Sequence, residues 1–145
     1  DVIFGPAYKG IPLAAAVATI LSNRSSHSVA ISFDRKEEKT HGEGGKIIGN
    51  VKDKKVLILD DVLTAGTALN QSIDLVRQTG GEGVSSVVAL DREEYLDGEL
   101  ARDLIEDKTS SKLLSIARIS QILDFLKQIK KSEEAHLIED YLSRQ

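Results

Sequence analysis

Two adjacent carboxylates, Asp60 and Asp61, follow the aliphatic run Val56–Leu59. Two like charges at the end of a buried strand cost free energy through desolvation and repulsion unless something binds there. Paired carboxylates can accept hydrogen bonds from vicinal hydroxyls, as on a ribose, or face a magnesium ion through water. The pair therefore indicates a binding site for a sugar diol or a hydrated cation.

The segment that follows, Thr64–Ala68, has the composition of a phosphate-binding turn. Gly66 permits a tight turn in which successive N–H groups point into one concavity, and the next helix N-terminus adds positive potential. Thr64 and Thr67 can donate hydroxyl hydrogen bonds. A ribose 5-phosphate would satisfy both the carboxylates and the turn. The alternative is a strand end with helix-capping residues, which would be the better reading of a lone Asp-Asp pair.

Three basic sites could serve other parts of such a ligand. Lys9 lies between Gly5 and Gly10 and could meet a pyrophosphate, although a lysine alone is more often merely solvated. Residues 34–46 contain no apolar side chain, and they carry Arg35, Lys36, Lys39, His41 and Lys46 against four carboxylates. We expect this segment to be a mobile loop that closes over a polyanion; the alternative is a solvated loop.

A further arginine, Arg92, follows the predicted strand Val84–Leu90. Its planar guanidinium suits a carboxylate ligand, which it can bind through two parallel hydrogen bonds. The alternative is an ion pair with Asp91 or Glu93.

The apolar spacing predicts the elements that position these residues. Strands are expected at Val2–Phe4, Val29–Phe33, Val56–Leu59, Val84–Leu90 and Lys112–Ala117, with an edge strand or turn at Ile47–Gly49. Helices are expected at residues 11–22, 67–79, 99–107, 119–130 and 133–143. This alternation predicts one α/β domain over residues 1–145, with a central, mostly parallel five-stranded sheet flanked by helices on both faces. Ligands bind such sheets beyond the carboxyl ends of the strands.

Composition narrows the function classes. The chain has 145 residues, a net charge of −4 and no cysteine, so thiol catalysis and thiolate metal sites are excluded. No apolar run approaches the roughly 20 residues that span a bilayer. We expect a cytoplasmic protein that binds neither nucleic acid nor membrane. The chain starts inside a predicted strand without a methionine, which suggests that an N-terminal segment is missing.

The nine residues Asp60–Ala68 resemble the signature of the type I phosphoribosyltransferases, which bind phosphoribosyl pyrophosphate (PRPP). Residues 4–14 look like the pyrophosphate loop of the orotate-specific members, and residues 33–45 look like their mobile catalytic loop. The resemblance implies the type I phosphoribosyltransferase fold and orotate phosphoribosyltransferase activity. That activity converts orotate and PRPP into orotidine 5′-monophosphate and pyrophosphate, in pyrimidine synthesis.

The resemblance also implies residue roles. Catalysis would fall to Lys36, Lys39, His41, Asp60 and Asp61. PRPP would be bound by these residues together with Tyr8, Lys9, Arg35, Val62, Leu63, Thr64, Ala65, Gly66, Thr67 and Ala68. Orotate would be bound by Thr64 and Arg92. Mg²⁺ would be held mainly by PRPP, pyrophosphate and water near the acidic pair, with no direct protein ligand. The active unit would be a homodimer in which the 34–46 loop reaches the partner's site.

Three other functions are compatible with parts of this pattern. A phosphoribosyltransferase for another base would share the Asp60–Ala68 signature, but the two orotate-type loops and Arg92 disfavour it. A PRPP-sensing module without catalysis could keep the acidic pair, but it has less reason to keep a basic catalytic loop. A nucleotide-binding domain with a fortuitous Asp-Asp turn would show no magnesium-dependent PRPP binding.

Overall fold

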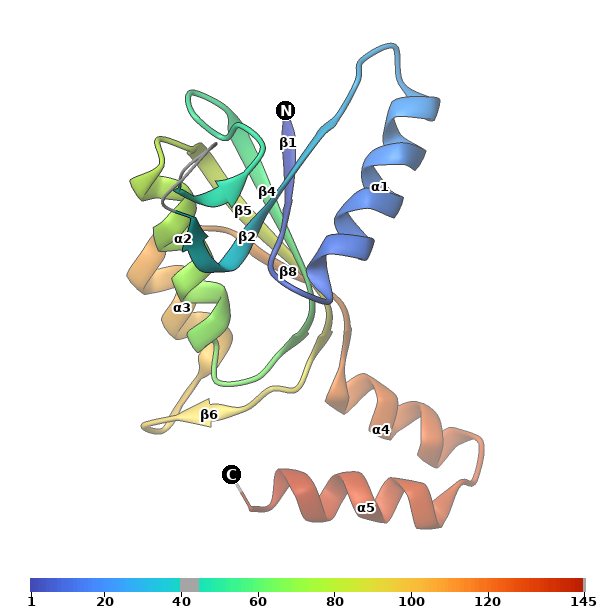
Figure 1. The fold of residues 1–145 in the computed structure, drawn as a ribbon. Helices are drawn as coiled ribbons and strands as arrows, with labels where there is room; N and C mark the ends of the chain where they lie inside the picture. Colours follow the sequence, from blue (N-terminus) through green and yellow to red (C-terminus); the bar gives the residue numbers. More distant parts are fainter. Residues whose placement is uncertain (40–44, 145) are drawn as a thin grey trace.

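The computed structural model describes residues 1–39 and 45–144. A six-stranded sheet has the strand order β3-β2-β1-β4-β5-β8, in which β3 alone is antiparallel to its neighbour (Figure 1). Its strands are β1 (Val2–Gly5), β2 (Ala30–Lys39), β3 (Gly45–Ile48), β4 (Lys55–Leu63), β5 (Glu82–Asp91) and β8 (Leu113–Arg118). A separate small hairpin joins β6 (Tyr95–Leu96) to β7 (Glu99–Leu100).

Helices cover both faces of the sheet. The helix α1 (Gly10–Arg24) covers one face, and α2 (Thr67–Gln78) and α3 (Ala101–Thr109) cover the other. Two further helices, α4 (Ile119–Gln128) and α5 (Ser132–Leu142), follow β8. Successive residues of a strand point to opposite faces, so Phe4 joins the core with Ile73 and Ile105 of α2 and α3, whereas Ile3 packs with Ala14 of α1. Among the described residues, no helix is long and apolar enough to cross a membrane.

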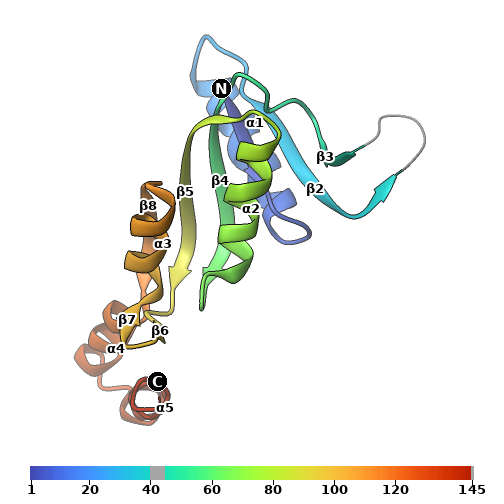
Figure 2. The same cartoon turned by 90° about the vertical axis from the view of Figure 1, so that its left-hand side faces the viewer.

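The functional edge is the one where the parallel strands end. Figure 1 shows α4 and α5 beyond the carboxyl ends of β5 and β8, apart from the helices that flank the sheet. Figure 2 shows β2 and β3 reaching away from the other strands at the opposite side of the sheet. The two regions bracket the ends of β1 and β4, where the candidate site residues gather.

The predicted fold class is confirmed, with two corrections. The sheet has six strands instead of five, because residues 34–46 are not simply a loop: β2 continues to Lys39 and pairs with β3 from Phe33–Ile48 to Lys39–Gly45. An antiparallel partner satisfies the backbone hydrogen bonds of a polar strand that no apolar pattern could reveal. Mobility was predicted for the whole of residues 34–46, of which residues 40–44 lie outside the described residues.

The second correction concerns the strand predicted at Val56–Leu59. It ends at Leu63, because β5 pairs with β4 through Asp60–Val88 and Leu63–Asp91. The acidic pair therefore lies within the paired part of β4 and not after the end of the strand. Pairing with β5 therefore holds the backbone immediately before and after Asp61, at Asp60 and Val62.

Candidate active site

The acidic pair is joined to the loop between β1 and α1 by one ion pair. Lys9 Nζ lies 2.8 Å from Asp61 Oδ2, and the two side chains are 78% and 32% exposed. The backbone N–H of Asp61 donates to Asp60 Oδ1 over 2.9 Å. Two segments that are 52 residues apart in the sequence thus meet at the end of the sheet.

The two carboxylates differ in acidity although they are neighbours. Burial raises the pKa of Asp60, and the charge of Asp61 adds to this increase. The hydrogen bond from Lys9 lowers the pKa of Asp61, and the same contact raises the pKa of Lys9. Lys9 therefore holds Asp61 in its ionised form and offsets part of the repulsion within the pair.

The turn after β4 has the geometry of an anion cradle. Gly66 has φ +78° and precedes the first residue of α2, and a Cβ at this position would lie 2.4 Å from Ile105 Cδ1. Both the backbone conformation and the contact with α3 require glycine here. No side chain caps the N-terminus of α2, so its first N–H groups remain able to bind an anion.

The loop between β1 and α1 is folded tightly against β4. The backbone N–H of Ala7 donates to Asp34 Oδ1 over 2.6 Å, and Gly10 N–H donates to Pro6 O over 3.0 Å. A Cβ on Gly10 would approach Leu59 O to 2.8 Å, so the backbone where this loop enters α1 lies directly on β4. The close approach brings Lys9 within reach of Asp61. Asp34 was assigned no such role from the sequence.

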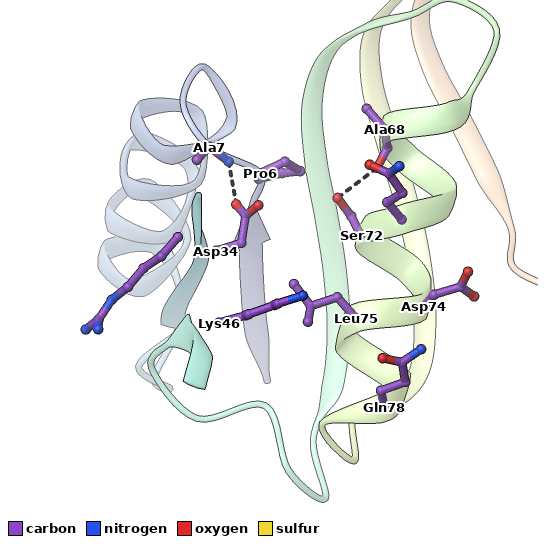
Figure 3. A pocket seen from close by; sticks show the side chains of 11 residues that line it. Pro6, Ala7, Asp34, Lys46, Ala68, Ser72, Asp74, Leu75 and Gln78 are labelled. Atoms are coloured by element: carbon purple, nitrogen blue, oxygen red, sulfur yellow. Dashed lines mark hydrogen bonds between the residues drawn. The ribbon is translucent and has the colours of Figure 1, made fainter. Parts of the chain in front are cut away.

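A cavity of about 570 Å³ opens beside this site, between the β2–β3 side and α2 (Figure 3). Its lining includes Arg35 and Ala68 from the predicted set. It also includes Lys46, which the sequence placed in the basic loop, and Pro6, Ala7 and Asp34 from the two loop segments. The sequence did not single out the remaining lining residues, which lie on α2: Gln71, Ser72, Asp74, Leu75 and Gln78. The lining residues on α2 recur at spacings of three and four residues. This spacing was the one signal in the sequence that could have placed them on a single face of the helix. The acidic pair lies outside this lining.

Arg92 sits at the end of β5, beside the start of the cradle. Its backbone N–H donates to Leu63 O over 3.1 Å. Its side chain pairs with Glu94, with Nη2 to Oε1 at 3.0 Å, and contacts Tyr141 of α5. The two ion-pair partners proposed as alternatives are used elsewhere: Asp91 binds Arg102, and Glu93 accepts the N–H of Ser120. Tyr141 carried no functional signal in the sequence.

The structure brings together the part of the predicted site that comes from the β1–α1 loop, the end of β4 and the start of α2. Tyr8 and Lys9 lie in the β1–α1 loop, Asp60 to Leu63 in β4, Thr64 to Gly66 in the turn, and Thr67 and Ala68 at the start of α2. Arg35, Lys36 and Lys39 lie on β2, and the side chains of Lys36 and Lys39 are outside the described part. His41 lies outside the described residues.

Comparison with known proteins agrees with this geometry. The family model "Phosphoribosyl transferase domain" matches residues 1–113. The orotate phosphoribosyltransferase of Marinobacter nauticus is 50% identical over 128 residues, which are 88% of this chain and 60% of that protein. The enzyme of the same name from Methylococcus capsulatus is 41% identical over 145 residues, covering 99% of this chain and 68% of that protein.

A solved structure shares the fold. The crystal structure of orotate phosphoribosyltransferase from Francisella tularensis superposes with a TM-score of 0.73 at 34% identity, over 88% of this chain and 61% of that chain. The chain spans about 60% of the length of the Marinobacter relative. The match over residues 1–113 places the signature, the cradle and Arg92 inside the family's domain. The chain therefore belongs to the phosphoribosyl transferase domain family, among whose members it resembles the orotate phosphoribosyltransferases.

Proposed function

We propose that the protein containing this chain is an orotate phosphoribosyltransferase, which transfers the phosphoribosyl group of PRPP to orotate. The observation that carries the proposal is the contact between Lys9 and Asp61. It joins a cation suited to pyrophosphate to carboxylates suited to ribose hydroxyls, directly before the anion cradle of Thr64–Ala68. One ligand with a 5-phosphate, a diol and a pyrophosphate would satisfy all three parts.

The binding roles follow from this order along the site. The N–H groups of Thr64–Ala68 would hold the 5-phosphate, and Asp60 and Asp61 would accept the ribose hydroxyls. Lys9 would leave Asp61 for the pyrophosphate, beside Tyr8. Arg35, Lys36, Lys39 and His41 would close over the same polyanion from β2 and the segment after it. Arg92 and Thr64 would receive orotate, the arginine through the base's carboxylate.

The reaction needs positioning and charge stabilisation more than covalent help. The bond between the anomeric carbon and the pyrophosphate oxygen breaks, the carbon becomes cation-like, and the orotate nitrogen supplies the electron pair of the new bond. The carboxylates of Asp60 and Asp61 hold the sugar in place, and the lysines stabilise the negative charge on the leaving pyrophosphate. Lys39 or His41 could donate a proton to the departing pyrophosphate.

A magnesium requirement is part of the proposal. Within residues 1–39 and 45–144, no group of three or more His, Asp or Glu side chains could hold a metal ion. The donor set at the site is the pair Asp60 and Asp61, and Lys9 already occupies one oxygen of Asp61. These residues fit a hydrated Mg²⁺ that enters with PRPP and faces the pair through water. When bound, it would neutralise charge on the pyrophosphate.

The assembly is proposed to be a homodimer in which the 34–46 segment of one subunit acts in the partner's site. Orotate and PRPP are the proposed small-molecule partners. The position of β2 and β3 at the sheet edge, reaching away from the other strands, supports an action outside their own subunit (Figure 2).

The test follows loss of orotate with magnesium and PRPP, with adenine, hypoxanthine and uracil as alternative bases. Because the chain spans about 60% of the Marinobacter relative's length, the assay should use the 145-residue chain beside the longest protein that carries this sequence. Selective consumption of orotate by either supports the proposal. Magnesium-dependent binding of PRPP with no turnover of any base would indicate a PRPP sensor in place of an enzyme. Preference for another base would replace orotate as the proposed substrate.

A further inference from the structure

A closed hydrogen-bonded triangle links Arg92 to the last helix. The hydroxyl of Tyr141 accepts from Arg92 Nε over 3.0 Å and from Nη2 over 2.6 Å. The same hydroxyl donates to Glu94 Oε1 over 2.6 Å, and Glu94 Oε1 lies 3.0 Å from Arg92 Nη2. The Tyr141 ring centroid is 4.9 Å from Arg92 Cζ, so the ring also supports the guanidinium through its face.

The triangle uses Nε and Nη2 of the guanidinium and leaves Nη1. Among the described residues, the hydrogen bonds of the Arg92 side chain all run from Nε and Nη2. The hydrogens of Nη1 therefore have no protein acceptor in this part of the chain. A carboxylate ligand could accept a hydrogen bond from Nη1 without displacing Tyr141 or Glu94.

The backbone under Arg92 is anchored independently of Tyr141. Asp91 is 2% exposed and forms an ion pair with Arg102 Nη1 at 2.9 Å, and Glu93 Oε2 accepts the N–H of Ser120 at 2.9 Å. The end of β5 is thus fixed by α3 and α4. Tyr141 from α5 fixes only the side chain, so a change there can reorient the guanidinium without moving the strand.

We propose that Tyr141 is a positioning residue that, with Glu94, orients the guanidinium of Arg92 toward the carboxylate of the base. This inference rests on the proposed function for its substrate. The hydroxyl accepts from the Nε–H of Arg92, whereas Glu94 Oε1 pairs with Arg92 only at Nη2. Without the hydroxyl, the Nε–H of Arg92 loses its acceptor, and the guanidinium keeps only the polar contact between Nη2 and Glu94, about which it can rotate away from the base.

The protonation of the hydroxyl fits this role. Burial, together with the hydrogen bond to Glu94, raises the pKa of Tyr141. The phenol therefore keeps its proton at neutral pH and remains a donor to Glu94 while accepting from Arg92.

The first test is Tyr141→Phe, which removes the hydroxyl and keeps the ring. The matched control is Tyr95→Phe, because Tyr95 lies in the nearby β6 hairpin and its side chain is 55% exposed. We expect Tyr141→Phe to raise the KM for orotate about tenfold with kcat and the KM for PRPP nearly unchanged, as for loss of a ground-state contact. Tyr95→Phe should change none of the three. Equal orotate KM values in both variants would overturn the proposal.

A double-mutant cycle separates positioning from packing. If Tyr141 acts through Arg92, adding Tyr141→Phe to Arg92→Ala should change the orotate KM less than twofold further. A tenfold further loss would show that α5 acts by another route and would overturn the proposal.

A readout without substrate keeps the inference distinct from the proposed function. The Nε–H resonance of Arg92 should show slow solvent exchange in the wild type and in Tyr95→Phe, and fast exchange in Tyr141→Phe. If no base is turned over but this contrast holds, the proposed function fails and the positioning of Arg92 stands. If the three proteins give the same exchange rate, the positioning fails whatever the activity.

Discussion

At the scale of single residues, the Lys9–Asp61 ion pair shows how a basic loop and an acidic strand end share one site before a ligand arrives. Lys9 lowers the pKa of Asp61 mainly through a direct hydrogen bond. Lys9→Ala should therefore raise the pKa of Asp61 toward its ordinary value of 3.8. Side-chain ¹³C NMR titration of the Asp61 carboxyl measures this. The control, Lys54→Ala, removes another exposed lysine and should leave the Asp61 pKa unchanged.

The sign of the pH effect on stability follows from the same pair. The folded-state pKa of Asp61 lies below its unfolded value, so the pair stabilises the fold above about the ordinary pKa and that contribution is lost as pH falls through the folded value. The wild type should therefore be slightly more stable to unfolding than Lys9→Ala at neutral pH, and the difference should vanish in acid. Urea denaturation of both proteins over a range of pH measures it. A difference that grows toward acid would contradict this account.

A second prediction at the residue scale concerns Gly66. Alanine there must hold φ +78° and place its Cβ 2.4 Å from Ile105 Cδ1, whereas Gly98 has φ +88° and open space around it. Gly98→Ala should lower the unfolding free energy by about 1 kcal/mol, the cost of the backbone alone. Gly66→Ala should cost about 1–3 kcal/mol more through overpacking. Urea denaturation of both variants measures the two losses, and equal losses would mean that α3 yields to the added methyl.

At the scale of elements, the sequence could predict those that bury an apolar pattern and could not predict those held by pairing alone. The aliphatic run before Asp60 and the two glycines around Lys9 indicated β4 and its neighbouring loop, and both were found. β2 beyond Phe33 was missed because its partner strand β3 extends it without adding apolar residues, and the end of β4 was missed because Asp60 and Asp61 interrupt its apolar run before Val62 and Leu63. Tyr141 was missed because its partners lie 47 and 49 residues away.

An ion pair with little exposure joins α3 to the end of β5. Asp91 is 2% exposed and Arg102 13%, so removing the cation would leave a carboxylate in the core. Arg102→Gln should lower the unfolding free energy by about 3–5 kcal/mol, as when one partner of a buried pair is lost. Asp103→Asn is the control, because Asp103 is 60% exposed and 3.8 Å from Arg102 Nε. Thermal denaturation compares them, and similar midpoints would contradict the importance of the pair.

At the scale of the whole molecule, the basic segment runs from the site to the edge of the sheet: Arg35 and Lys46 line one cavity with Ala68 of the cradle, whereas Lys39 lies farther along β2. Asp61 lies in β4 near the centre of the sheet, and Lys39 lies at the end of β2, which reaches away from the other strands (Figure 2). A segment so placed can serve a neighbouring subunit, and the proposed homodimer makes this testable. A Lys39→Ala subunit keeps an intact acidic pair, and an Asp61→Asn subunit keeps an intact basic segment.

Each variant alone should be nearly inactive. If the segment acts in the partner's site, each heterodimer holds one complete site, and an equal mixture that exchanges freely should recover about a quarter of wild-type orotate consumption. If the segment acts within its own subunit, every site in the mixture stays broken and no activity returns. Differently tagged subunits, purified as verified heterodimers, give the decisive measurement, because a lack of orotate consumption can then not be due to failed subunit exchange. Mixing either variant with itself after the same exchange step is the control.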